Sequence, residues 1–153
     1  QTLGGDSYAL AIITAAAGIG SLFASAWIGL GRMDKSEIQR YLWPMVFIGI
    51  AATAFLNLSG SLVPISVIFV VTGFTATIAG IGAQTLIQLE VEESYRARVM
   101  TWWSTISFGS LVFGGIIIGY LGDVIGIGNA IVIMMLIGGV VALYVSAFVR
   151  EPK

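Results

Sequence analysis

All seven basic residues of the chain fall in three short places, and long apolar stretches separate these places. The places hold Arg32, Lys35 and Arg40, then Arg96 and Arg98, and finally Arg150 and Lys153. If each apolar stretch crosses a bilayer once, alternate crossing brings all three places to one face, with only Asp6 and Asp123 as charges on the other. Cytoplasmic loops of membrane proteins carry an excess of Lys and Arg. The pattern therefore predicts a multi-pass helical membrane protein with a cytoplasmic C-terminus.

The composition agrees with a membrane solvent. With 153 residues, 58% hydrophobic and 10% charged, the chain has too little polar surface to cover a water-soluble globule. The net charge of -1 and the scattered basic residues argue against a nucleic-acid partner. Cysteine and histidine are both absent, which excludes a disulfide, a thiolate nucleophile, an imidazole base and a Cys/His metal site. We therefore expect no enzyme activity, no metal and no cofactor.

Five apolar stretches are long enough to cross a hydrocarbon core of about 30 Å, which needs roughly 20 helical residues. We expect an all-α fold with one transmembrane domain over residues 1–153 and helices at about 8–30, 41–58, 62–89, 99–121 and 125–149. The second stretch barely reaches this length. Short turns, expected at 59–61 and at Gly122 and Asp123, make neighbouring helices antiparallel. Five crossings place the N-terminus outside and the C-terminus inside.

Polar residues inside the expected helices form stripes. At 100° per residue, Ser66, Gly73, Thr77, Gly80, Gln84 and Gln88 share an arc of about 80° on the third helix. Similar stripes hold Thr14, Gly18, Ser21 and Ser25 on the first helix, and Thr101, Ser104, Thr105 and Phe108 on the fourth. Candidates for lining a water-filled cavity or contacting a solute are Ser21, Ser25, Thr77, Gln84, Gln88, Thr101 and Thr105.

The stripes also have a simpler interpretation. Gly, Ser and Thr let helices approach closely and hydrogen-bond across the contact, so most of these positions can mark helix packing instead. A glutamine amide is bulkier and needs several partners that lipid does not supply. Gln84 is therefore the stronger cavity candidate, whereas Gln88 is near enough to the helix end to reach the headgroups.

Charged residues occur only near the ends of the expected helices. Because no Asp, Glu, Lys or Arg lies in the middle of any stretch, the sequence predicts no proton relay or ion site. Glu92 and Glu93 lie four and three residues before Arg96, so we expect a helical turn with local ion pairs in the loop 90–98. Gln1 stands where an initiator Met is expected, and this indicates a cut N-terminus.

Three segments resemble the C-terminal half of a major facilitator superfamily transporter: Gly119–Asp123, the loop Glu92–Met100 and Ala16–Leu22. The likeness covers nearly the whole chain and is greatest to the bacterial efflux branch, similar to enterobactin and macrolide exporters. It implies that the five helices correspond to helices 8 to 12 of a twelve-helix protein in the bacterial inner membrane. The family's cavity is lined by helices 7, 8, 10 and 11, which matches the striped helices.

The resemblance also implies cytoplasmic gating loops, with Asp34, Arg96 and Arg98 as candidates. The loop Gly29–Arg40 departs from the family pattern G-x-x-x-D-R-x-G-R-K because it lacks the second glycine. The run Gly109–Gly115 is glycine-rich like the family's antiporter motif but has no proline, so it does not indicate proton antiport. If the resemblance holds, the N-terminal half and the seventh helix are missing.

These observations predict a segment of a secondary transporter that exports a small amphipathic or apolar solute by alternating access. Its partners are then the lipid bilayer, the N-terminal half of the same transporter and the solute. The alternative from another class is a membrane anchor or assembly subunit that transports nothing. An intramembrane enzyme is disfavoured because the helices contain no acid, base or nucleophile better than Ser or Thr.

Overall fold

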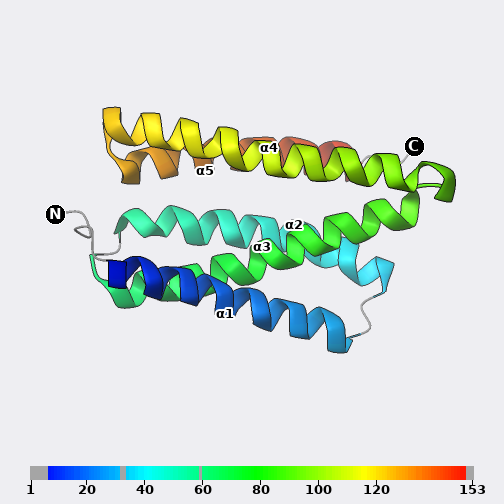
Figure 1. The fold of residues 1–153 in the computed structure, drawn as a ribbon, viewed down its shortest axis with the longest axis horizontal. Helices are drawn as coiled ribbons and strands as arrows, with labels where there is room; N and C mark the ends of the chain where they lie inside the picture. The colour runs from blue at the N-terminus through cyan, green and yellow to red at the C-terminus, as the bar shows by residue number, and fades with distance from the viewer. Residues whose placement is uncertain (1–6, 32–33, 59, 151–153) are drawn as a thin grey trace.

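The computed structural model describes residues 7–31, 34–58 and 60–150, which form an all-helical bundle (Figure 1). In chain order the elements are α1 (Ser7–Gly31), α2 (Lys35–Ala54), the short 3-10 helix η1 (Phe55–Leu58), α3 (Leu62–Glu90), α4 (Glu93–Ile125) and α5 (Ile127–Arg150). Successive α-helices run in opposite directions. The predicted all-α class is confirmed. Within the described residues, α1, α3, α4 and α5 are long and apolar enough to cross a membrane.

Helix α2 differs most from its prediction. It begins at Lys35, six residues before the expected start at residue 41, because Asp34 caps it. The Asp34 carboxylate accepts a hydrogen bond from the backbone N–H of Lys35 at 2.7 Å, which satisfies one free donor of the first turn. The α-helix ends at Ala54 and continues as η1. Its charged first turns make α2 less apolar than the other four helices.

The predicted charged loop 90–98 is a break of only two residues, so Arg96 and Arg98 lie inside α4. The backbone carbonyl of Glu92 accepts the N–H groups of Tyr95 and Arg96 at 3.0 and 3.1 Å, which starts the helix. The predicted ion pairs of Glu92 and Glu93 with Arg96 were wrong. In the described part of the chain, the only ion pair joins Lys35 to Glu90.

The turn between α4 and α5 was also predicted too early. Helix α4 continues through Gly122 and Asp123 to Ile125, and the chain turns at Gly126. Gly126 has φ +86° and ψ 142°, a conformation that L side chains rarely adopt. Its N–H donates to the carbonyl of Gly122 at 3.0 Å and closes the last turn of α4.

Helix α3 packs against both α1 and α2, whereas the backbones of α1 and α2 do not approach each other closely in the described residues and meet through the Trp27 and Tyr41 rings. The α1–α3 contact depends on glycine. A Cβ atom on Gly20 would lie less than 3.0 Å from backbone atoms of Val70 and Phe74, and one on Gly73 less than 3.0 Å from the backbone of Ala17. On the α2 side, a Cβ on Gly82 would lie 3.2 Å from Ile38. Small residues therefore set how closely these helices approach.

Helices α4 and α5 form a hairpin beside the first three helices (Figure 1). Helix α5 packs on α2 and α4, whereas α4 meets α3 only near their shared turn. No described residue of α4 is buried. One long face of α4 is therefore without a packing partner among the described helices.

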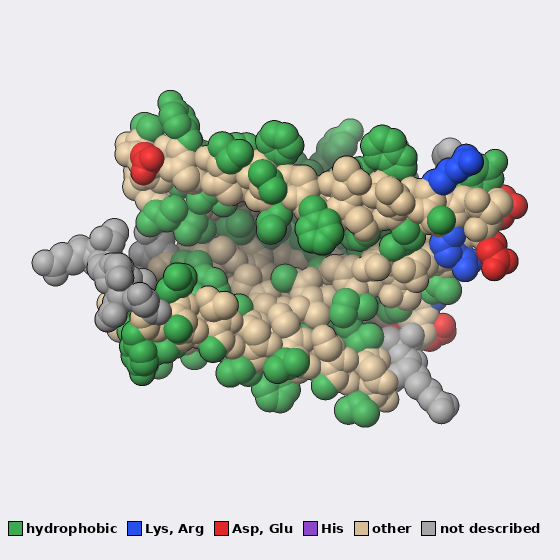
Figure 2. Space-filling model, in the orientation of Figure 1, with side chains coloured by type: hydrophobic (Ala, Val, Ile, Leu, Met, Phe, Trp, Pro, Cys, Tyr) green, Lys and Arg blue, Asp and Glu red, His purple; other side chains and the backbone are tan. Residues whose placement is uncertain are grey.

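The molecule buries small side chains and exposes large ones. Among the described residues, four of the six buried apolar ones are alanines (Ala9, Ala16, Ala24 and Ala130), while many Leu, Ile, Val and Phe side chains point outward. The accessible surface is 10633 Å², against roughly 7,400 Å² for a compact soluble protein of this mass. Apolar side chains extend along the length of the molecule, and charges gather near its ends (Figure 2). This surface suits contact with hydrocarbon.

Candidate functional site

Two of the three basic places meet at one end of the bundle. Lys35, at the start of α2, and Glu90, at the end of α3, form an ion pair with Nζ and Oε1 2.5 Å apart. The Lys and Arg side chains visible in Figure 2 lie at this end. The structure therefore places the turn before α2 and the turn before α4 side by side, as alternate crossing predicts.

The gating candidates are not brought together. Asp34 serves as the N-cap of α2, and Arg96 and Arg98 are exposed on the first turns of α4. In the described residues Asp34 forms an ion pair with neither arginine. Sequence reasoning missed the pair that does form, between Lys35 and Glu90. The sequence did carry a signal for this pair, because the two residues have opposite charges and the predicted topology places both at the same face of the membrane.

On α1, Ser21 lies in the contact with α3. Its hydroxyl is within hydrogen-bond distance of the carbonyl of Ala17 at 3.1 Å and that of Gly73 on α3 at 3.3 Å. Ser25 is exposed and donates to the carbonyl of Ser21 at 2.9 Å. Ser21 therefore joins two helices, while Ser25 remains at the surface beside the contact.

On α3, the three predicted residues follow the flank of this contact. At 100° per residue, Thr77 and Gln84 lie within about 40° of Gly73, which touches α1. Thr77 is half-buried, and both Gln84 and Gln88 are exposed. Neither glutamine amide has a hydrogen-bond partner among the described residues. The predicted α3 stripe is thus an open polar edge beside α1.

On α4, Thr101 and Thr105 are exposed. Their hydroxyls donate to the carbonyls of Ala97 and Thr101, both at 2.9 Å, so each is satisfied by its own helix. Because α4 does not pack on α1 and meets α3 only near their shared turn in the described structure, these two residues stay apart from Ser21 and Thr77. The structure groups the α1 and α3 candidates and leaves the α4 candidates separate.

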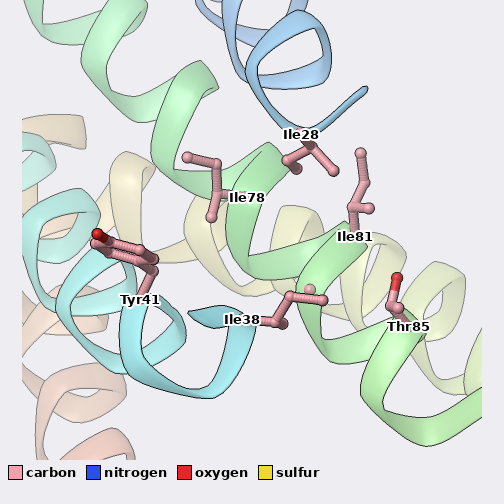
Figure 3. A pocket seen from close by; sticks show the side chains of 7 residues that line it. Ile28, Ile38, Tyr41, Ile78, Ile81 and Thr85 are labelled. Atoms are coloured by element: carbon pink, nitrogen blue, oxygen red, sulfur yellow. The ribbon is translucent and has the colours of Figure 1, made fainter. Parts of the chain in front are cut away.

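Two apolar hollows lie on the surface of α3, in the space between α1 and α2. The sequence did not predict either hollow. The larger has a volume of about 420 Å³ and is lined by Phe23, Met45, Ile48, Val71, Phe74 and Thr75, together with Gly20 and Val70. The smaller, about 20 Å³, lies among Ile28, Ile38, Tyr41, Ile78, Ile81, Gly82 and Thr85 (Figure 3). No predicted cavity residue lines either hollow. The hollows form where three helices meet, which helical periodicity alone does not reveal.

The arrangement offers binding surfaces and no catalytic cluster in the described residues, where no three Asp or Glu side chains come together to hold a metal. The comparisons with known proteins add no family: no protein family, curated protein or solved structure matches this chain. The geometry of the polar edge and the hollows is therefore the evidence for function.

Proposed function

We propose that the chain is the membrane-embedded segment of a secondary transporter of the major facilitator type, which exports a small amphipathic or apolar solute. One observation carries the proposal. The polar stripes of α1 and α3 both border the α1–α3 contact, where the Ser21 hydroxyl reaches the Gly73 carbonyl, and Phe23, which lines the larger apolar hollow, lies about 160° around α1 from Ser21. A segment with one polar and one apolar flank suits a position between a solute path and lipid.

The glutamines support a solute path. Gln84 and Gln88 expose amides that no described residue satisfies. An unsatisfied amide in hydrocarbon costs several kcal/mol, on the order of 2–7 kcal/mol by transfer measurements. In hydrocarbon, water, a solute or a polar residue of another helix must therefore meet the Gln84 amide, whereas Gln88 is near enough to the helix end to reach the headgroups.

The third polar stripe lies on α4. It has no buried described residue, and its polar positions Thr101 and Thr105 face away from the protein. We propose that a second helical half completes the cavity there, with the two halves rocking around a midplane site. The cationic end then lies in the cytoplasm, and α2 crosses the bacterial inner membrane with the other four helices.

The test is solute efflux by cells that express the full-length protein. Gln84→Leu and Thr77→Leu are each expected to lower efflux at least about tenfold, which corresponds to about 1.4 kcal/mol. The matched control is Thr72→Leu, on the same helix but away from the stripe. Its hydroxyl already donates to the carbonyl of Ile68 at 2.7 Å. Unchanged efflux in both stripe variants, at normal expression, would remove them from the site.

An assembly subunit that transports nothing is the second candidate. The hydroxyls of Ser21 and Thr101 favour it, because both are satisfied inside the protein and need no solute. These 153 residues contain no cysteine, so single cysteines at Gln84 and Thr101 would be the only thiols of this segment. Ready reaction with a water-soluble thiol reagent in the intact protein supports a water-filled path. Resistance at both positions supports helix packing and the assembly subunit.

A further inference from the structure

We infer that the cationic end of the bundle binds the headgroup of phosphatidylethanolamine, at one site on α2 and one on α4. Glu37 and Arg40 form the site on α2, and Glu92 and Arg96 form the site at the start of α4. The inference rests on the membrane embedding in the proposed function. It goes beyond that function because it assigns a lipid to the charged ends of the helices.

Each site holds a cation and an anion that do not neutralise each other. Glu37 is three residues before Arg40, and Glu92 is four residues before Arg96. At these spacings the two side chains are neighbours on the helix surface, with Cβ atoms about 5–6 Å apart. All four side chains are exposed, and the only ion pair in the described residues joins two other side chains. Both charges of each site are therefore free to bind a ligand.

Tryptophan residues place these charges in the headgroup layer. The ion pair between the start of α2 and the end of α3, and the two-residue break before α4, bring the first turns of α2 and α4 to the same level. At 1.5 Å per residue, Trp43 lies about 12 Å along α2 from its start, and Trp103 about 15 Å along α4. Trp rings prefer the membrane–water interface. Arg40 and Arg96 lie closer to the helix starts, and helical side chains lean toward the N-terminus, so both guanidinium groups lie at or beyond this interface.

The charge balance selects a zwitterion. The three basic places and the residues next to them hold all seven basic residues of the chain and six of its eight acidic residues. Basic and acidic side chains lie next to one another at this end (Figure 2). An end with nearly balanced charge does not attract anionic lipids through an excess of Lys and Arg. Phosphatidylethanolamine carries one phosphate and one ammonium group, two carbon atoms apart, and so fits a cation and an anion one helical turn apart.

The hydrogen-bonding groups match in the same way. A guanidinium binds a phosphate through two parallel N–H groups. A primary ammonium has three N–H donors, and a glutamate carboxylate accepts from them. The trimethylammonium of phosphatidylcholine has no N–H group, and phosphatidylglycerol has no cation, so neither lipid satisfies both side chains of a site.

The sites lie away from the proposed solute path. Arg96 lies about 140° around α4 from Thr101 and about 180° from Thr105. Helix α2 carries none of the solute-contact candidates. A lipid can therefore occupy both sites while a second helical half covers the polar stripe of α4.

The experiment counts the lipids bound to the full-length protein by native mass spectrometry. The protein is titrated in detergent with phosphatidylethanolamine, phosphatidylcholine or phosphatidylglycerol of identical acyl chains. Phosphatidylethanolamine should bind at least about tenfold more tightly than the other two, because it alone makes hydrogen bonds to both charged side chains. Glu37→Gln should remove one tightly bound phosphatidylethanolamine, and Glu37→Gln with Glu92→Gln should remove two. The matched control is Glu90→Gln, which should leave the number unchanged because Glu90 already pairs with Lys35.

A charge exchange provides the second control. Glu37→Arg with Arg40→Glu keeps the net charge and both kinds of group but reverses their order relative to the membrane. Because the phosphate lies between the glycerol and the ammonium of the lipid, the exchanged pair should also lose one phosphatidylethanolamine, at unchanged helicity. If helicity falls, Glu37→Gln, which keeps the size of the side chain, decides.

Equal binding of the three lipids, tighter binding of phosphatidylglycerol, or a phosphatidylethanolamine count that survives both glutamine substitutions would overturn the inference. Each of these results leaves the membrane embedding and the proposed function standing, because lipid still binds. Binding of no phospholipid at all would contradict the embedding and, with it, both the inference and the proposed function.

Discussion

The close α1–α3 contact gives the sharpest stability prediction. Gly20→Ala adds a Cβ atom less than 3.0 Å from the backbone of Val70 and Phe74, whereas ordinary contact begins near 3.4 Å. Backbone cannot rotate away, so the two helices must move apart until the Cβ atom reaches ordinary contact distance. Overpacking of this kind typically costs about 1–3 kcal/mol.

Separation also weakens a hydrogen bond across the contact. The Ser21 hydroxyl lies 3.3 Å from the Gly73 carbonyl, and such bonds in membranes average about 0.6 kcal/mol. Replacing Gly by Ala inside a helix recovers roughly 0.5–1 kcal/mol of chain entropy. We therefore expect Gly20→Ala to lower the free energy of unfolding by about 1–3 kcal/mol overall.

Gly18→Ala is the matched control, because a Cβ atom on Gly18 meets nothing within 4 Å. It should stabilise by about 0.5–1 kcal/mol through helix propensity alone. The assay is reversible unfolding in mixed detergent micelles, followed by helicity. A Gly20→Ala, Gly73→Ala double variant should cost less than the sum of the two singles, because one separation relieves both clashes. Equal stabilities for Gly20→Ala and Gly18→Ala would refute the close crossing.

Three further predictions use the same unfolding assay. Lys35→Glu should lower the free energy of unfolding by less than about 1 kcal/mol, because the side chains of its pair with Glu90 are 44% and 60% exposed. The double variant Lys35→Glu with Glu90→Lys should restore that stability, and equal stability of the single and double variants would contradict the ion pair. Gly126→Ala should cost about 1–3 kcal/mol, because its φ of +86° is strained for alanine, and a neutral result would argue against this turn. Thr105→Val should change stability by less than about 0.5 kcal/mol, because its exposed hydroxyl bonds only its own helix; a loss above 1 kcal/mol would indicate a partner on another helix.

Hydropathy located the helices but not all of their ends. It marks where apolar residues stop, whereas a helix stops where its backbone donors and acceptors find other partners. Asp34 therefore starts α2 inside the polar segment, and Gly126 ends α4 beyond the expected turn at Gly122. The second helix, already marginal by length in the sequence, is the one that falls short in apolarity.

For the candidate site, the sequence predicted only which residues share a face of one helix. Periodicity placed Thr77 and Gln84 on one side of α3, and the structure places that side along the flank of α1. Which helix lies next to a face depends on packing between segments far apart in the chain, such as Gly20 against Val70. The two apolar hollows between α1 and α2 and the Lys35–Glu90 pair depend on the same packing, so the sequence did not reveal them.

We propose that the cationic turns share one face of a membrane that all five helices cross. Single cysteines at Ser36, Ser61 and Ser94 test it directly, because the chain has no cysteine of its own and all three serines are exposed. In sealed vesicles of one orientation, an impermeant thiol reagent should label the Ser36 and Ser94 positions from the same side and the Ser61 position from the other. Labelling of the Ser36 and Ser94 positions from opposite sides would rule out this topology.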